Sequence, residues 1–82
     1  MSLTIDEIRN YLVEEFALEA DEIDADTPLF SSELLDSFSM VNVLMFLEKT
    51  AGIRFSPAEV TLRNIDTMNS MVSWVESSRD AQ

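Results

Sequence analysis

The chain has 82 residues, 46% of them hydrophobic, and 16 acidic against 5 basic side chains give it a net charge of −11. This length corresponds to one small domain, and this apolar content supports a packed core rather than a disordered acidic tail. The sequence contains no histidine and no cysteine. It therefore lacks the commonest general base, the commonest metal ligand and any thiolate, and we expect neither a catalytic residue nor a metal site.

The negative charge argues against nucleic acid and anionic membranes as partners, because both are bound through lysine and arginine. The longest apolar run, residues 43–47, is far too short to span a bilayer. The first ten residues carry acids where a signal peptide needs an apolar stretch. We expect a monomeric cytoplasmic protein, not inserted in a membrane, whose partners are proteins with basic docking surfaces.

The first predicted helix covers about residues 4–18. Thr4 and Glu7 form a capping box at its start, and Leu3 and Ile8 occupy the positions of a hydrophobic staple. A long acidic loop follows over residues 19–35, and long loops in compact domains are held by their own anchors or are functional. The expected anchors of this loop are Ile23, Leu29, Phe30 and one of Leu34 or Leu35.

The second predicted helix starts at Asp36-Ser37 and runs to about Thr50, with Gly52 ending it. Its apolar residues surround most of the helix circumference, which is typical of a central helix packed by several neighbours. We expect Met45 to be mostly buried.

A short third helix is predicted to begin at "FSPAEV", residues 55–60, with Ser56 as cap, Pro57 as the first helical residue and Glu59 completing a capping box. The last helix is predicted to start near Asp66-Thr67. Its pattern places Met68 and Met71 in the core and Trp74 as a half-buried cover.

Residues 76–82 are polar and are expected to fray, which leaves a core of about residues 4–76. The prediction is an all-α four-helix bundle with a long first loop and a short third helix, forming one domain over residues 1–82.

The Asp36-Ser37 step has two interpretations. Asp36 is a favourable N-cap, and Leu35 with Met40 would complete a staple, so the step is explained as a helix start. Alternatively, Ser37 presents its hydroxyl outward beside free backbone N–H groups and the positive end of the helix dipole, where a phosphate is favoured. Asp36 could then help to hold a metal-bound phosphate donor. These residues by themselves leave both interpretations open.

The acidic loop, Asp-Ser followed by a large apolar residue, and "GIRFSPAEV" one helix later together resemble acyl carrier and peptidyl carrier proteins. The similarity extends over nearly the whole chain, from "IDEIRNYLVEEF" to "NSMVSWV". It implies that a phosphopantetheinyl transferase attaches the 4′-phosphopantetheine arm of coenzyme A to Ser37, with Asp36 in support. The thiol of the arm would carry an acyl or aminoacyl group as a thioester, and partner enzymes would do the catalysis.

The second helix departs from fatty-acid-type carriers, which usually have acids on its exposed face. The corresponding positions here are Ser39, Asn42 and Lys49. We predict a more apolar partner interface in which Phe38 is half buried and Met40 more exposed. The predicted interface consists of Phe38, Ser39, Met40 and Asn42.

The stretch "ELLDSF" resembles D-alanyl carrier proteins, as does "LRNIDTMNSMV" before the last helix. This resemblance implies a stand-alone carrier that serves a dedicated loading ligase and a downstream transferase. The implied cargo is an amino acid or a short acyl group.

A calcium sensor is one alternative. Four acids of the first loop fall at positions 1, 3, 5 and 12 of an EF-hand count, namely Glu22, Asp24, Asp26 and Glu33. However, Thr27 stands where the EF-hand needs glycine, and Pro28 stands where a backbone carbonyl binds the ion.

The other alternative is a small acidic helical adaptor with no prosthetic group. Its docking face would be a methionine-rich surface, as methionine adapts to varied partners. That surface would consist of Met40, Met45, Met68 and Met71. Enzymatic modification of Ser37 would separate a carrier from an adaptor.

Overall fold

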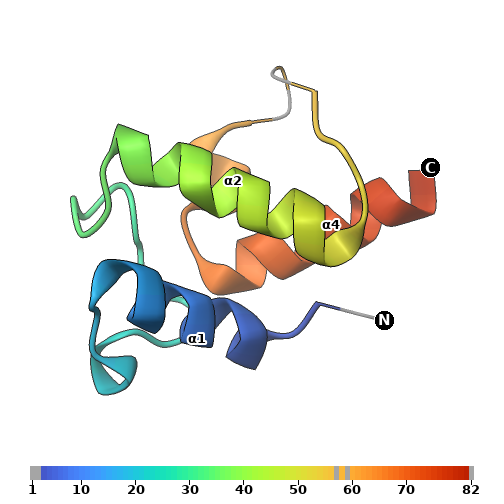
Figure 1. The fold of residues 1–82 in the computed structure, drawn as a ribbon. Helices are drawn as coiled ribbons and strands as arrows, with labels where there is room; N and C mark the ends of the chain where they lie inside the picture. The colour runs from blue at the N-terminus through green and yellow to red at the C-terminus, as the bar shows by residue number, and fades with distance from the viewer. Residues whose placement is uncertain (1–2, 57, 59, 82) are drawn as a thin grey trace.

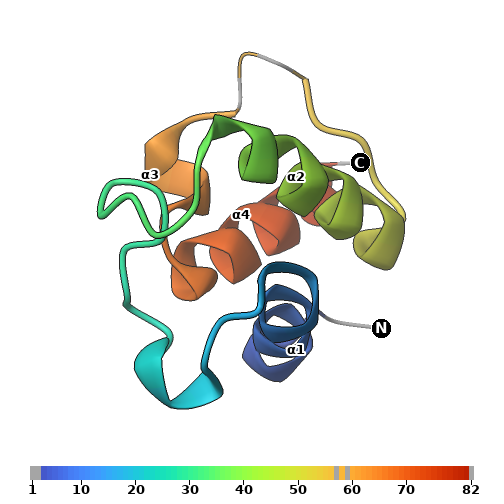
Figure 2. The same cartoon turned by 60° about the vertical axis from the view of Figure 1, so that its left-hand side comes forward.

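The computed structural model describes residues 3–56, 58 and 60–81. These residues form four α-helices, one short 3-10 turn (η1) and no strand, which confirms the predicted all-α bundle. Helix α4 contacts each of the other three helices, and Figures 1 and 2 show α1 and α2 packed around it. The elements in chain order are α1 (Ile5–Phe16), η1 (Ala20–Glu22), α2 (Ser37–Ala51), α3 (Leu62–Ile65) and α4 (Met68–Ala81).

Helix α1 begins at the two residues of the predicted capping box, with the Glu7 side chain bonded to the Thr4 hydroxyl rather than to the Thr4 backbone N–H. The Glu7 backbone N–H donates to the Thr4 hydroxyl (3.2 Å), and that hydroxyl donates to the Glu7 carboxylate (3.2 Å). The helix ends at Phe16 because Ala17 adopts the left-handed conformation, with a φ of 56°. Tyr11 of α1 stacks on Phe46 of α2 with ring centroids 4.1 Å apart, which joins the two helices.

The core collects side chains from every helix and from the first loop. Met68 and Met71 are fully buried, as predicted, whereas Met45 is 61% exposed, so the prediction of a buried Met45 is wrong. Trp74 is only 7% exposed and is buried more deeply than the half-buried cover that the sequence suggested. The fully buried residues are Ile8, Leu12, Ile23, Leu29, Val43, Leu47, Ile65, Met68, Met71 and Val75.

The acidic loop between α1 and α2 is held by its apolar residues, as predicted. Four of the expected anchors are buried, namely Ile23, Leu29, Phe30 and Leu35. Leu34 is 42% exposed, so Leu35 and not Leu34 is the leucine that anchors the loop. The loop therefore lies on the helices instead of standing away from them, and it delivers the chain to the start of α2.

Helix α3 is short, as predicted, but it begins at Leu62 rather than just after Ser56. Pro57 and Glu59, on which the predicted helix start depended, lie outside the described residues. The described part of the segment is tied to its neighbours by Phe55, whose N–H donates to the Glu48 carboxylate (2.9 Å) and whose ring stacks on Trp74. These contacts hold the chain along α2, and the helix forms only after Thr61.

Helix α4 continues to Ala81, beyond residue 76, where the sequence suggested the start of a frayed tail. Ser78 explains part of this extension, because it is 8% exposed and lies one turn after the buried Trp74. Up to Ser78, α4 therefore still has a side that packs on the bundle.

Candidate functional site

Ser37 is the first residue of α2 and is exposed, and Asp36 before it is the N-cap. Oδ1 of Asp36 accepts from the backbone N–H of Ser39 (2.9 Å) and from the Ser39 hydroxyl (2.9 Å). The hydrogen bond from the Ser39 N–H, followed by that from its hydroxyl, holds the pKa of Asp36 below its usual value. Asp36 is thus an ionised carboxylate fixed next to an exposed hydroxyl. The predicted cap is confirmed.

A cavity of about 580 Å³ opens beside Ser37, between the end of the acidic loop, the first turn of α2 and the start of α3. It is large enough to receive an extended group attached to the serine hydroxyl. The first turn of α2 has no acidic side chain, so the helix dipole and the N–H groups at the helix start favour a phosphate there. The lining residues are Phe30, Glu33, Leu35, Asp36, Ser37, Met40 and Leu62.

Asp66, between α3 and α4, holds the loop that forms one wall of this cavity. Its carboxylate accepts from the Phe30 N–H (2.8 Å), the Ser31 N–H (2.9 Å) and the Ser31 hydroxyl (2.6 Å). Its backbone carbonyl accepts from the Leu29 N–H (2.7 Å). Partial burial would raise the pKa of Asp66, but these hydrogen bonds outweigh it and leave the pKa below its ordinary value.

The predicted partner interface is only partly on the surface. Phe38 is 85% exposed rather than half buried, whereas Met40 is the more buried of the two and packs against the core, so this pair of predictions is reversed. Asn42 is exposed, whereas Ser39 is half-buried and its hydroxyl donates to Asp36. The exposed apolar residues of α2 are Phe38, Val41 and Met45, which we call the apolar strip.

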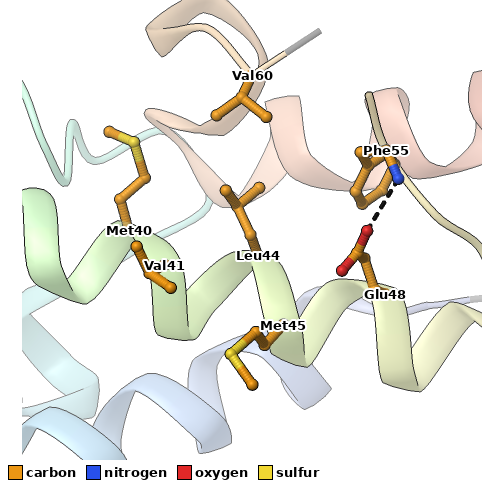
Figure 3. A pocket seen from close by; sticks show the side chains of 7 residues that line it. All are labelled: Met40, Val41, Leu44, Met45, Glu48, Phe55 and Val60. Carbon is orange, nitrogen blue, oxygen red and sulfur yellow. Dashed lines mark hydrogen bonds between the residues drawn. The ribbon is translucent and has the colours of Figure 1, made fainter. Parts of the chain in front are cut away.

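An apolar groove of about 550 Å³ runs between α2 and the segment that leads to α3 (Figure 3). Met40 lines both this groove and the cavity beside Ser37, so the two spaces meet at this side chain. Glu48 is the one charged residue among those that line the groove, and its Oε2 accepts from the Phe55 N–H (2.9 Å). The lining residues are Met40, Val41, Leu44, Met45, Glu48, Phe55 and Val60.

The sequence singled out Ser37 and Asp36 as candidates but did not indicate the contacts of Asp66 and Glu48. Asp66 reads as an ordinary helix-start residue, and nothing near it indicates partners at residues 29–31, which are more than thirty positions away. Glu48 reads as one charge of a cancelling pair with Lys49. An acid on an otherwise apolar helix is the signal that could have singled out Glu48, because a charge at such a position needs a partner.

The described part of the chain contains no cluster of three or more acids arranged to hold a metal ion. Asp24, one of the acids of the EF-hand count, instead closes a local turn by accepting from the Asp26 N–H (3.0 Å) and the Thr27 hydroxyl (3.0 Å). Among the described residues, no helix is long and apolar enough to cross a membrane.

Comparison with known proteins agrees with this geometry. Residues 6–75 match the family described as "Phosphopantetheine attachment site". The chain is also 31% identical over 58 residues to the "Probable acyl carrier protein PigG" of Serratia sp. (strain ATCC 39006), across 71% of this chain and 67% of that protein. Members of this family carry a covalent 4′-phosphopantetheine group, and the exposed serine, the helix start and the adjoining cavity described above fit such a group. The chain therefore belongs to the phosphopantetheine-binding carrier protein family.

Proposed function

We propose that Ser37 is the attachment residue and that the chain carries an acyl or aminoacyl group for partner enzymes without itself being a catalyst. The observation that supports this most directly is the exposed hydroxyl of Ser37 on the first turn of α2, beside the ionised Asp36 and an open cavity. When bound, the arm supplies a thiol that forms a thioester with the cargo. The chain's lack of cysteine and histidine is consistent with this division of labour.

In the attachment step, Ser37 Oγ forms a bond to the phosphorus on the pantetheine side of coenzyme A, and the pyrophosphate bond to the adenosine half breaks. The hydroxyl proton passes to a base of the transferase. Asp36 is held by Ser39 through Oδ1. The other carboxylate oxygen of Asp36 is available to a metal ion that accompanies the phosphate donor.

The apolar strip together with Asn42 is the surface that we assign to partner enzymes, in place of the predicted set of Phe38, Ser39, Met40 and Asn42. Residues 37–47 carry no charge, while nine acids and no base lie between Glu14 and Asp36. A partner would therefore be steered by the acids of the loop and would then bury Phe38, next to Ser37, in an apolar pocket. The partners that we propose are a phosphopantetheinyl transferase, a loading ligase and a downstream transferase.

The first experiment is an intact-protein mass measurement after incubation with coenzyme A and a broad-specificity phosphopantetheinyl transferase. The proposal predicts a gain of one phosphopantetheine mass in the wild type. It predicts the same gain in the control Ser73→Ala, which removes an exposed serine of α4. It predicts no gain in Ser37→Ala. An unmodified wild type with its helices intact by circular dichroism would refute the carrier role and favour the adaptor.

The cargo that we propose is an amino acid or a short acyl group, which rests on the resemblance of "ELLDSF" to D-alanyl carriers. Loading assays that compare short and long acyl groups with aminoacyl groups test this part separately. Acceptance of long-chain acyl groups alone would overturn it and leave the carrier role intact.

A further inference from the structure

The carboxylate of Glu48 is a charged feature inside an otherwise apolar groove. One oxygen, Oε2, is engaged by the Phe55 N–H, and within the described residues no hydrogen bond to the other oxygen is present. Lys49 and Arg54 line an adjoining depression together with Glu48. Figure 3 shows Glu48 and Phe55 at one end of the groove and Met40 at the other. The groove thus combines apolar walls with one available anionic acceptor.

The groove adjoins the cavity beside the proposed attachment residue, because Met40 lines both the groove and that cavity. Glu48 follows Ser37 by eleven positions, which at 1.5 Å per residue places it about 16 Å along α2. The arm has about 14 bonds between the serine oxygen and its sulfur, and it spans about 16 Å if each bond advances as in an extended peptide chain. The first atoms of a cargo, rather than the end of a long chain, therefore come level with Glu48.

Resting on the proposed carrier function, we propose that Glu48 is a specificity-determining residue of this groove. It favours a cargo with an ammonium group next to the thioester carbonyl, and it disfavours a cargo with a carboxylate there. An α-amino group would pair with the available Glu48 oxygen while its side chain contacts the apolar walls. A carboxylate on the same carbon would be repelled by the negative charge of Glu48 and by the net charge of −11 on the whole chain.

The expected preference is modest, because the groove is open to solvent and Lys49 and Arg54 lie nearby. Ion pairs that water can reach change populations by about two- to fivefold. The inference therefore concerns the fraction of cargo that lies in the groove, and not an absolute barrier to loading.

The test uses three cargoes that share the same α-carbon and its methyl group, joined to the arm through a stable amide. Alanyl carries an ammonium on its α-carbon, isobutyryl a methyl group at that place and methylmalonyl a carboxylate. The fraction of cargo in the groove is measured from NMR shifts of the Met40 and Met45 methyl groups, which line it. We expect the largest shifts with alanyl, smaller ones with isobutyryl and the smallest with methylmalonyl. The fraction of cargo in the groove should be about two- to fivefold higher for alanyl than for isobutyryl.

Glu48→Gln is the matched variant, because its amide oxygen can still accept from the Phe55 N–H while the charge is removed. In this variant the alanyl advantage should be lost, and isobutyryl should shift the methionine methyl groups at least as much as alanyl does, because an unpaired ammonium gains nothing from apolar walls. Glu76→Gln removes the same charge from an exposed position on α4 and should leave the wild-type order unchanged.

Equal shifts for the three cargoes, or an order that persists in Glu48→Gln, would overturn the role of Glu48. An order lost equally in Glu76→Gln would also overturn it, because net charge would then be the cause. The mass measurement separates these results from a failure of the carrier function, in which no arm is attached to Ser37 in the first place.

Discussion

Replacing Asp66 with alanine should destabilise the protein by about 2 kcal/mol, even though Asp66 is only partly buried. The change leaves three donors without their acceptor: the N–H groups of Phe30 and Ser31 and the Ser31 hydroxyl. Hydrogen bonds to a charged group contribute about 1.5–3 kcal/mol each when water is excluded. Water can replace Asp66 at the exposed Ser31, so the sum falls well below three such bonds.

Thermal and urea unfolding followed by circular dichroism measure this loss directly. For a domain of this size, 2 kcal/mol corresponds to a decrease in Tm of about 8–16 °C. Asp21→Ala is the control, because it removes an exposed acid and changes the net charge equally. The loss of stability in Asp66→Asn should lie between those of Asp66→Ala and Asp21→Ala, since the amide oxygen of asparagine can still accept from the backbone N–H groups of the loop.

The pH dependence gives a second check on the same variant. The pKa of Asp66 is lower in the folded protein than in the unfolded chain, where it is about 3.9. The stabilisation is therefore present above the unfolded pKa and is lost as the pH falls through the folded pKa. The difference between wild type and Asp66→Ala should be constant near neutral pH and shrink below about pH 4. The reasoning would be refuted if Asp66→Ala lowered Tm no more than Asp21→Ala does. It would also be refuted if the stability difference between wild type and Asp66→Ala persisted in acid.

Gly52→Ala should cost about 1 kcal/mol of stability, because Gly52 ends α2 with a φ of 70°, although no atom lies near enough to clash with an added methyl group. Gly52→Asn should cost less in the same unfolding assay. Equal losses in the two variants would contradict a backbone origin. Phe38→Ala should change the free energy of unfolding by less than about 0.5 kcal/mol, because the side chain is 85% exposed. The same variant should slow modification of Ser37 in a timed mass assay, and an unchanged rate would remove Phe38 from the partner surface. Phe55→Ala should lower stability by about 2 kcal/mol through the loss of its stacking on Trp74, with urea unfolding as the measurement, whereas Phe55→Leu should recover part of the loss.

The features that local sequence could predict are those made by neighbouring residues. The capping of α1 by Thr4, the start of α2 at Asp36-Ser37 and the end of α2 at Gly52 each depend on contacts within a few positions. Because the candidate site lies at one of these starts, its hydroxyl and carboxylate could be proposed without a structure. The family resemblance supplied the chemistry that these residues alone left open.

The features that could not be predicted depend on how the helices and loops pack against one another. Helix α2 has apolar residues around most of its circumference, so its periodicity does not say that Phe38 and Met45 face outward while Met40 faces inward. The contacts of Asp66 with the loop and of Glu48 with Phe55 are likewise tertiary, and no local pattern encodes them.

The stacking of Phe55 on Trp74 also provides a built-in optical signal. Trp74 is the only tryptophan of the chain, and its ring lies 3.9 Å from that of Phe55, which forms part of the groove wall. Any molecule that displaces Phe55 must therefore change the surroundings of the one indole in the protein. Intrinsic fluorescence of the unlabelled chain thus reports on the groove in real time, without a dye, a tag or an introduced residue.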